Sequence, residues 1–155
     1  MEAVILCGVQ GAGKTTLYRD RFLETHARVS MDLLRTRARE AAFLKTCLDT
    51  KMPFVVDATN PTPADRRRYL EPAREAGFRV IGYLVEVADV QALARNAARE
   101  GRRRVPAGAV VGTGRRLLRP TPEEGFDELW HATAAPDGGW RIEPLLTTPP
   151  LPGIG

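Results

Sequence analysis

The stretch GVQGAGKTT, at positions 8 to 16, combines three glycines with a lysine and two threonines. Gly8, Gly13, Lys14 and Thr15 fit the spacing G-x-x-x-x-G-K-[ST], the P-loop pattern. In such a loop, backbone N–H groups surround a phosphate, the lysine reaches the β- and γ-phosphates, and the threonine hydroxyl can ligate Mg²⁺. Because the guanine-reading pattern N-K-x-D is absent, we expect ATP with Mg²⁺. The residues predicted to bind the nucleotide here are Gly8, Gln10, Gly11, Ala12, Gly13, Lys14, Thr15 and Thr16.

The segment MDLLR places Asp32 just after a short strand-like run and Arg35 three residues later. In parallel α/β sheets, ligands bind at the carboxyl ends of strands. If a helix starts here, both side chains share one face. The carboxylate could then hold an acceptor hydroxyl in line with the γ-phosphate, and the arginine could bind an anionic group of the acceptor. A helix N-cap at Asp32 and a solvated Arg35 would explain the same residues without a function.

Asp57 ends the apolar run of FVVDATN. This is the strand-end position at which an aspartate meets Mg²⁺, directly or through water, although a strand-end aspartate can also simply start a turn. The three consecutive arginines 66–68 follow on a predicted helix. They cannot all share one face, so most of them are expected to be solvated.

A basic window covers residues 95–119, where eight arginines stand against one glutamate. The window therefore carries +7, whereas the whole chain carries only +4. Arg95 and Arg99 are one helical turn apart, and EGRRRVPAG follows them like a hinge. We predict a lid at about 95–112 whose arginines neutralise charge on a transferred phosphoryl group. A solvated charged surface is the competing interpretation.

These residues need a scaffold, and the rest of the chain predicts one. Short apolar runs alternate with longer helical patterns, which indicates βα units and a mainly parallel sheet. Strands are predicted at residues 3–7, 27–31, 54–57, 78–87 and 126–132, with a weaker candidate at 140–146. Helices are predicted at residues 14–24, 33–48, 63–76, from 89 onward and at 107–118. Thr62 is the expected N-cap of the third helix and Gly77 its end.

Composition predicts one domain in the cytoplasm. The 155 residues, 43% hydrophobic and 27% charged, suit one soluble domain over residues 1–146, and the Pro/Gly-rich residues 147–155 are expected to form a tail. No apolar run reaches the length of a membrane span, so no membrane partner is expected. The start of the chain lacks a signal-peptide pattern. Cys7 is expected to be a small buried hydrophobe. Nothing in the sequence indicates an oligomeric state.

The ordered motifs resemble the kinase domain of the 5′-hydroxyl polynucleotide kinases. The matching pieces are GVQGAGKTT, MDLLR, VVDATNPTPADRRRYL, RNAARE before VP, and RPTPEEGF. The resemblance implies an α/β P-loop kinase fold with a mainly parallel five-stranded sheet, its first strand central, flanked by helices and covered by an Arg-rich helical lid. It also implies transfer of the γ-phosphate of ATP to the 5′-hydroxyl end of DNA or RNA.

The same resemblance implies roles for individual residues. Asp32 would be the general base or would orient the hydroxyl, and Arg35 would contact the phosphate on the 3′ side of the terminal nucleoside. Lys14 and Arg99 would stabilise the transition state, with Arg95 as a second lid arginine. Related enzymes often carry a 3′-phosphatase domain, but this chain has no Asp-x-Asp pattern. We therefore expect no phosphatase.

Two other functions fit the same motifs. A small-molecule kinase for a sugar, nucleoside or antibiotic hydroxyl would use the same P-loop, and so would an ATP-binding switch without turnover. The basic window and Arg35 favour a nucleic-acid acceptor, since a neutral sugar needs neither. Asp32 argues against a switch, which needs no acceptor base. The residues fit DNA and RNA, and single-stranded and duplex ends, equally well.

Overall fold

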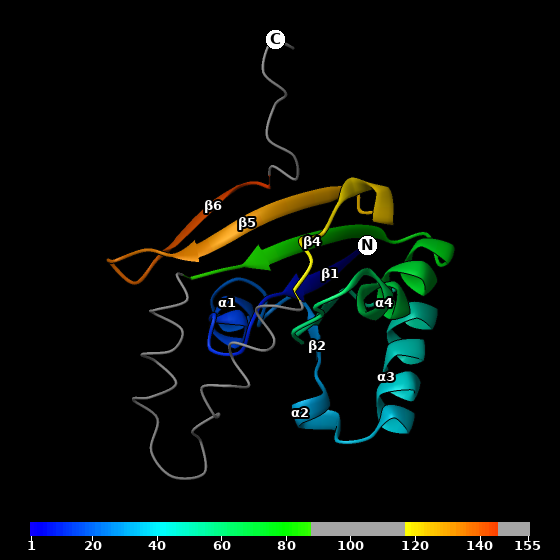
Figure 1. Cartoon of the computed structure of the whole chain (residues 1–155). Coiled ribbons are helices and arrows are strands. Elements are labelled where there is room, and N and C mark those ends of the chain that lie inside the picture. The colour runs from blue at the N-terminus through cyan, green and yellow to red at the C-terminus, as the bar shows by residue number, and fades with distance from the viewer. Residues whose placement is uncertain (88–116, 146–155) are drawn as a thin grey trace, which may run out of the picture.

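A twisted sheet forms the centre of the computed structural model, which describes residues 1–87 and 117–145. The strands are β1 (Glu2–Cys7), β2 (Ala27–Val29), β3 (Phe54–Val56), β4 (Arg79–Val85), β5 (Glu128–Ala134) and β6 (Trp140–Pro144). They lie in the order β2-β3-β1-β4-β5-β6 (Figure 1). The first five in this order pair in parallel. The expected parallel core of five strands with the first strand central is therefore confirmed.

The sheet has six strands rather than five, because β6 pairs antiparallel with β5. A tight turn joins the two strands. The Ala135 N–H donates to the Gly139 carbonyl oxygen at 2.8 Å, and the Gly138 N–H donates to the Ala135 carbonyl oxygen at 3.0 Å. The chain therefore returns beside β5 without a crossover, which requires the antiparallel direction.

Helices cover both faces of the sheet (Figure 1). They are α1 (Lys14–Arg21), α2 (Met31–Leu34), α3 (Arg37–Thr50) and α4 (Pro63–Glu75), with a 3₁₀ turn, η2 (Pro122–Glu124). Alternate residues of β1 face opposite sides: Val4 and Leu6 pack in one apolar cluster with α1, and Ala3 and Ile5 pack in another with α3 and α4. Burial on both faces explains the continuous apolar run in β1. Within the described part of the chain, no helix is long and apolar enough to cross a membrane.

The predicted helix over residues 33–48 is wrong in one respect, because the structure divides this region into α2 and α3. Arg35 has φ 75° and ψ −35°, and the Thr36 N–H donates to the Leu34 carbonyl oxygen at 2.9 Å. These values describe a γ-turn centred on Arg35. The Thr36 hydroxyl then accepts from the Arg39 N–H and caps α3. The sequence analysis expects Asp32 and Arg35 to share one helix face. In the structure they do not, because α2 ends before Arg35.

Other boundaries agree more closely. Thr62 caps α4 by accepting from the Asp65 N–H, Pro63 is the first helical residue, and Gly77 closes the helix with φ 84°. The first helix ends at Arg21 rather than at residue 24. The predicted helices beyond residue 88, the lid at 95–112 and the tail at 147–155 lie outside the described residues, except that residues 117 and 118 have no regular structure.

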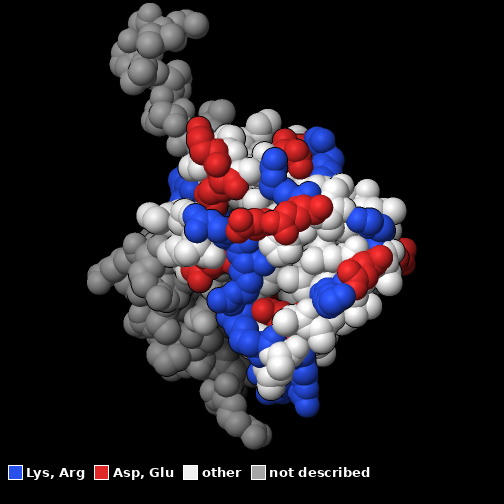
Figure 2. All heavy atoms as spheres, turned by 90° about the vertical axis from the view of Figure 1, so that its right-hand side faces the viewer, with Lys and Arg blue, Asp and Glu red and all other residues white. Residues whose placement is uncertain are grey.

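Charges of both signs lie side by side on the face formed by α3 and α4 (Figure 2). The ion pairs there include Lys45 with Asp49, one turn apart on α3. Of the basic window, only residues 117–119 are described, and they include the exposed Arg119.

Candidate active site

The phosphate loop joins β1 to α1. Gly13 is the N-cap of α1 with φ 104°, a conformation that favours glycine. Lys14 is buried, and its Nζ donates to the carbonyl oxygens of Gly8 and Val9, each at 2.8 Å. Burial lowers the pKa of Lys14 to about 8, against the opposing attraction of Asp57, Cys7 and Asp32. The lysine is therefore held inside the loop. A bound phosphate would place a negative charge beside its ammonium group and would favour the charged form.

Gly8 is required by the sheet as well as by the loop. A Cβ atom built on Gly8 would lie 2.3 Å from the Val85 carbonyl oxygen. The Gly8 N–H donates to the Thr59 carbonyl oxygen at 3.0 Å, which ties the loop to the segment after β3. Gly8 and Ala12, the other two residues predicted to bind the nucleotide, do not line the pocket described below.

Thr15 and Asp57, the two predicted metal ligands, are in direct contact. The Thr15 hydroxyl donates to Asp57 Oδ2 at 2.9 Å, and the guanidinium of Arg28 contacts the same oxygen at 2.9 Å. A hydroxyl and a carboxylate at one point suit Mg²⁺, which takes few protein ligands and completes its shell with water and phosphate oxygens. In the described ranges there is no group of three His, Cys, Asp or Glu side chains that could hold a metal alone. These residues therefore fit Mg²⁺ bound together with a nucleotide.

A pocket of about 780 Å³ opens along the carboxyl edge of the sheet. Of the predicted residues, Gln10, Gly11, Gly13, Lys14, Thr15, Thr16, Asp32 and Asp57 line it. Gln10 Oε1 and Ser30 Oγ are buried without a hydrogen-bond partner in the described residues. Buried polar atoms are normally paired, so these two fit contacts with a polar ligand. Arg95 and Arg99 lie outside the described residues.

The wall of the pocket beyond Asp32 carries two arginines that sequence reasoning missed. Arg37 and Arg68 both line the pocket. Arg37 pairs with the buried Glu40 at 2.8 Å and donates to the Tyr69 hydroxyl at 3.3 Å. Arg68 has no hydrogen-bond or ion-pair partner among the described residues, so its charge is available to a ligand. The spacing of Asp65, Arg68 and Tyr69 on one helical face could have indicated this wall.

Arg35 takes a different position from the one predicted. It is exposed, it ends α2, and it does not line the pocket. Arg37, which the sequence analysis did not select, lines the pocket instead because α3 begins there.

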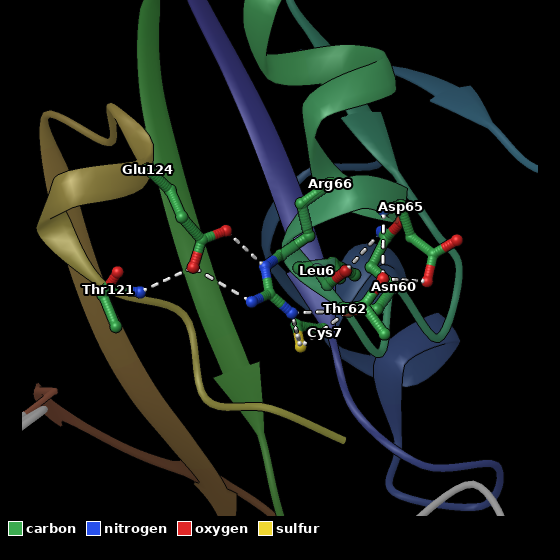
Figure 3. Close-up of polar contacts among 8 residues, drawn as sticks. All are labelled: Leu6, Cys7, Asn60, Thr62, Asp65, Arg66, Thr121 and Glu124. Atoms are coloured by element: carbon green, nitrogen blue, oxygen red, sulfur yellow. Dashed lines mark hydrogen bonds and ion pairs between the residues drawn. The ribbon is translucent and has the colours of Figure 1, made fainter. Parts of the chain in front are cut away.

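Arg66 and Glu124 form a buried ion pair next to Cys7, the last residue of β1 before the phosphate loop (Figure 3). Arg66 is fully buried, donates from Nε and Nη2 to the Glu124 carboxylate at 2.7 and 3.0 Å, and donates from Nη1 to the Asn60 carbonyl oxygen at 2.8 Å. Its Nη1 also lies 3.6 Å from Cys7 Sγ. The prediction that most of the three arginines are solvated is confirmed for Arg67 and Arg68. Arg66 is the exception, and its partner comes from η2.

Asn60 and Cys7 complete this network. The Asn60 side-chain amide donates to the Leu6 carbonyl oxygen at 2.8 Å, and Glu124 accepts from the Thr121 N–H at 2.9 Å. Cys7 is buried, as expected, and burial raises its pKa to about 11. Hydrogen bonds thus join the end of β1, the segment after β3 and η2 at the point where the phosphate loop begins.

Comparison with known proteins places this geometry in a family. A sequence profile described as "AAA domain" matches residues 4–120. The chain belongs to this AAA domain family. The matched range contains the phosphate loop and both carboxylates, Asp32 and Asp57.

The AAA domain also resembles a curated relative. It is 29% identical over 134 residues to the bifunctional polynucleotide phosphatase/kinase of Schizosaccharomyces pombe. The match covers 83% of this chain but 32% of the yeast protein, so the chain spans about a third of that protein's length.

Solved structures share the fold at low sequence identity. A gluconokinase from Sinorhizobium meliloti superposes with a TM-score of 0.59 at 16% identity, covering 86% of this chain and 83% of that one. Kti12 of Chaetomium thermophilum with ADP-AlF3 gives 0.65 at 16% identity, covering 84% and 88%. The expected α/β P-loop kinase fold, with a mostly parallel sheet flanked by helices, is therefore confirmed.

Proposed function

We propose that this AAA domain is an ATP-dependent kinase that phosphorylates the 5′-hydroxyl end of DNA or RNA. The observation that carries the proposal is the composition of one pocket. It joins the phosphate loop to a wall holding a carboxylate, Asp32, and two arginines, Arg37 and Arg68. A hydroxyl acceptor that is itself anionic matches that wall. The relative from Schizosaccharomyces pombe, which is named a bifunctional polynucleotide phosphatase/kinase, supports the same substrate class.

The reaction assigns a task to each group. Lys14 binds the β- and γ-phosphates, and Arg99 and Arg95 act from the lid. Thr15 and Asp57 would hold Mg²⁺, which would supply positive charge beside the phosphates. Asp32 orients the attacking hydroxyl, because the transition state of phosphoryl transfer is loose and needs positioning more than a strong base. Arg35 contacts the next phosphate of the acceptor beyond the mouth of the pocket, while Arg68 meets the terminal nucleotide inside it.

A small-molecule kinase is the second candidate. Arg35 is the residue assigned to the second phosphate of a polynucleotide, yet it lies outside the pocket. An acceptor small enough to be held by Arg37 and Arg68 alone would fit this arrangement. A switch without turnover would leave Asp32 without a task.

Transfer of labelled γ-phosphate separates these functions. Oligonucleotides with 5′-hydroxyl ends, as DNA and RNA, are compared with gluconate, other sugars and nucleosides. We expect labelling of the oligonucleotides, and loss of labelling in Asp32→Asn with retained ATP affinity. Asp49→Asn, a change on the outer face of α3, is the matched control. Labelling of a small compound without the oligonucleotides would overturn the polynucleotide assignment, and absence of labelling with every acceptor would favour a switch.

We also propose the boundaries and location of the enzyme. Residues 1–146 form one kinase domain with its lid at about 95–112, residues 147–155 form a tail, and the protein acts in the cytoplasm. Limited proteolysis should cut first in the tail and in the lid.

A further inference from the structure

An aromatic side chain lies at the end of the pocket away from Asp32. Trp140, the first residue of β6, lines the pocket together with the hairpin residues Gly138 and Gly139. Its Nε1 donates to Asp20 Oδ2 on α1 at 3.0 Å. Its Cη2 lies 3.2 Å from the place that a Cβ on Gly13 would occupy. The indole is therefore held along α1, between its N-cap Gly13 and Asp20 near its end, next to the phosphate loop.

The strand order shows which part of a bound nucleotide meets this side chain. Asp32 follows β2 and Asp57 follows β3, which both lie on one side of β1. The hairpin that carries Trp140 follows β5, on the other side of β1. The phosphate that is transferred must face the acceptor, so the γ-phosphate end of the donor points toward β2 and β3. The nucleoside end then extends toward β4, β5 and the hairpin.

We propose that Trp140 forms the nucleobase subsite of the phosphate donor, with its indole stacking on the base. This inference rests on the proposed kinase function and adds to it the residue that binds the nucleoside. A tryptophan ring offers a broad apolar surface for a flat base. Gly138 leaves room beside it, because a Cβ there would meet no atom within 4 Å. Stacking by itself does not distinguish one base from another.

Fluorescence tests the stacking directly. The chain has two tryptophans, and Trp130 packs on the cluster under α1 without lining the pocket. Trp130→Phe therefore leaves Trp140 as the single tryptophan. We expect Mg²⁺-ATP to quench its emission in a saturable way, whereas Mg²⁺-tripolyphosphate, which has no base, should not. If calorimetry detects ATP binding while the emission stays constant, the base lies elsewhere and the proposal fails.

Calorimetry with variants separates stacking from support of the loop. Trp140→Ala should weaken ATP binding roughly 5- to 150-fold, the range expected for loss of one base–aromatic stack. Its affinity for tripolyphosphate should stay that of the wild type. Trp140→Phe retains an aromatic ring, although it loses the bond to Asp20 and the outer part of the indole near Gly13, so it should keep most of the ATP affinity.

The remaining outcomes each decide between explanations. Equal losses for ATP and tripolyphosphate in Trp140→Ala would mean that Trp140 only supports the loop through Gly13, which overturns the subsite. Unchanged ATP affinity in that variant, with transfer intact, would overturn the subsite and leave the kinase function standing. A wild-type protein that binds no ATP would overturn both.

Discussion

The ammonium group of Lys14 is bound by two carbonyl oxygens of its own loop rather than by a carboxylate. Carbonyl oxygens are neutral, so they position the lysine without cancelling its charge. The charge therefore stays available to a phosphate, in a buried place where electrostatic interactions are strong.

Replacing Lys14 by alanine should remove phosphoryl transfer and leave the fold intact. We expect transfer to fall roughly a hundredfold or more, as for loss of one group that stabilises the transition state. Lys45→Ala, an exposed lysine on α3, is the control and should retain full activity. Steady-state assays with circular dichroism would measure both effects. An active, folded Lys14→Ala would refute the assignment of the phosphate loop.

Ionisation of the Cys7 thiol should lower the free energy of unfolding at alkaline pH. Burial raises its pKa from 9.0 to about 11, so the unfolded chain ionises first. The stability that the buried thiol contributes is complete below pH 9 and is lost as pH rises toward 11, by about 3 kcal/mol. Denaturant unfolding at several pH values, compared with Cys7→Ala, would measure this. A variant with the same pH slope as the wild type would contradict the assignment.

At the scale of elements, the γ-turn between α2 and α3 stands out. Residues other than glycine rarely adopt φ 75°, and such strain often marks functional positions. The turn ends α2 after one turn and lets Thr36 start α3 in a new direction. Arg35 is thereby placed outside the pocket and Arg37 at its wall.

Two variants of Arg35 separate strain from binding. Arg35→Gly should be about 1 kcal/mol more stable than Arg35→Ala, because only glycine relieves the positive φ. Both variants remove the guanidinium, so both should weaken the binding of acceptors with a 3′-phosphate to the same extent. Unfolding curves and kinetics with nucleosides that carry or lack that phosphate would show this. If the binding of nucleosides with and without that phosphate is weakened equally, Arg35 does not contact the phosphate.

At the scale of the whole molecule, the Arg66–Glu124 pair joins segments that are far apart in the chain (Figure 3). Breaking such a pair leaves one charge buried without a partner, whereas removing both charges does not. The pair is therefore expected to show strong coupling.

Glu124→Gln alone should cost roughly 3–5 kcal/mol of unfolding free energy, since it leaves the Arg66 charge unbalanced. The double variant Arg66→Met, Glu124→Leu should cost less than the sum of the single changes. Asp49→Asn, which breaks the exposed pair with Lys45, should cost less than about 1 kcal/mol. Urea unfolding of the wild type, the single variants and the double variant would measure the coupling energy between Arg66 and Glu124. Additive losses of unfolding free energy would contradict an interacting buried pair.

The residues that could be predicted from the sequence belong to one local motif or follow one strand. Lys14 and Thr15 are fixed by the spacing of the P-loop, and Asp57 by the end of β3. Trp140 was missed because only the assembled sheet brings the hairpin to the pocket, whereas Arg68 was missed because its helix face was not considered together with Asp65 and Tyr69. The break at Arg35 was missed although Thr36, whose hydroxyl accepts from the Arg39 N–H, carries a local N-cap signal for α3.

Gly8 has a consequence for how the site comes into being. Its backbone lies so close to the Val85 carbonyl oxygen that no side chain fits between them. The phosphate loop therefore takes its final shape against β4, not as a local turn that could form early. Because the ligand binds only the folded chain, ATP should raise the melting temperature in proportion to the logarithm of its concentration. Phosphate binding during refolding would thus report the moment at which β4 has docked on β1.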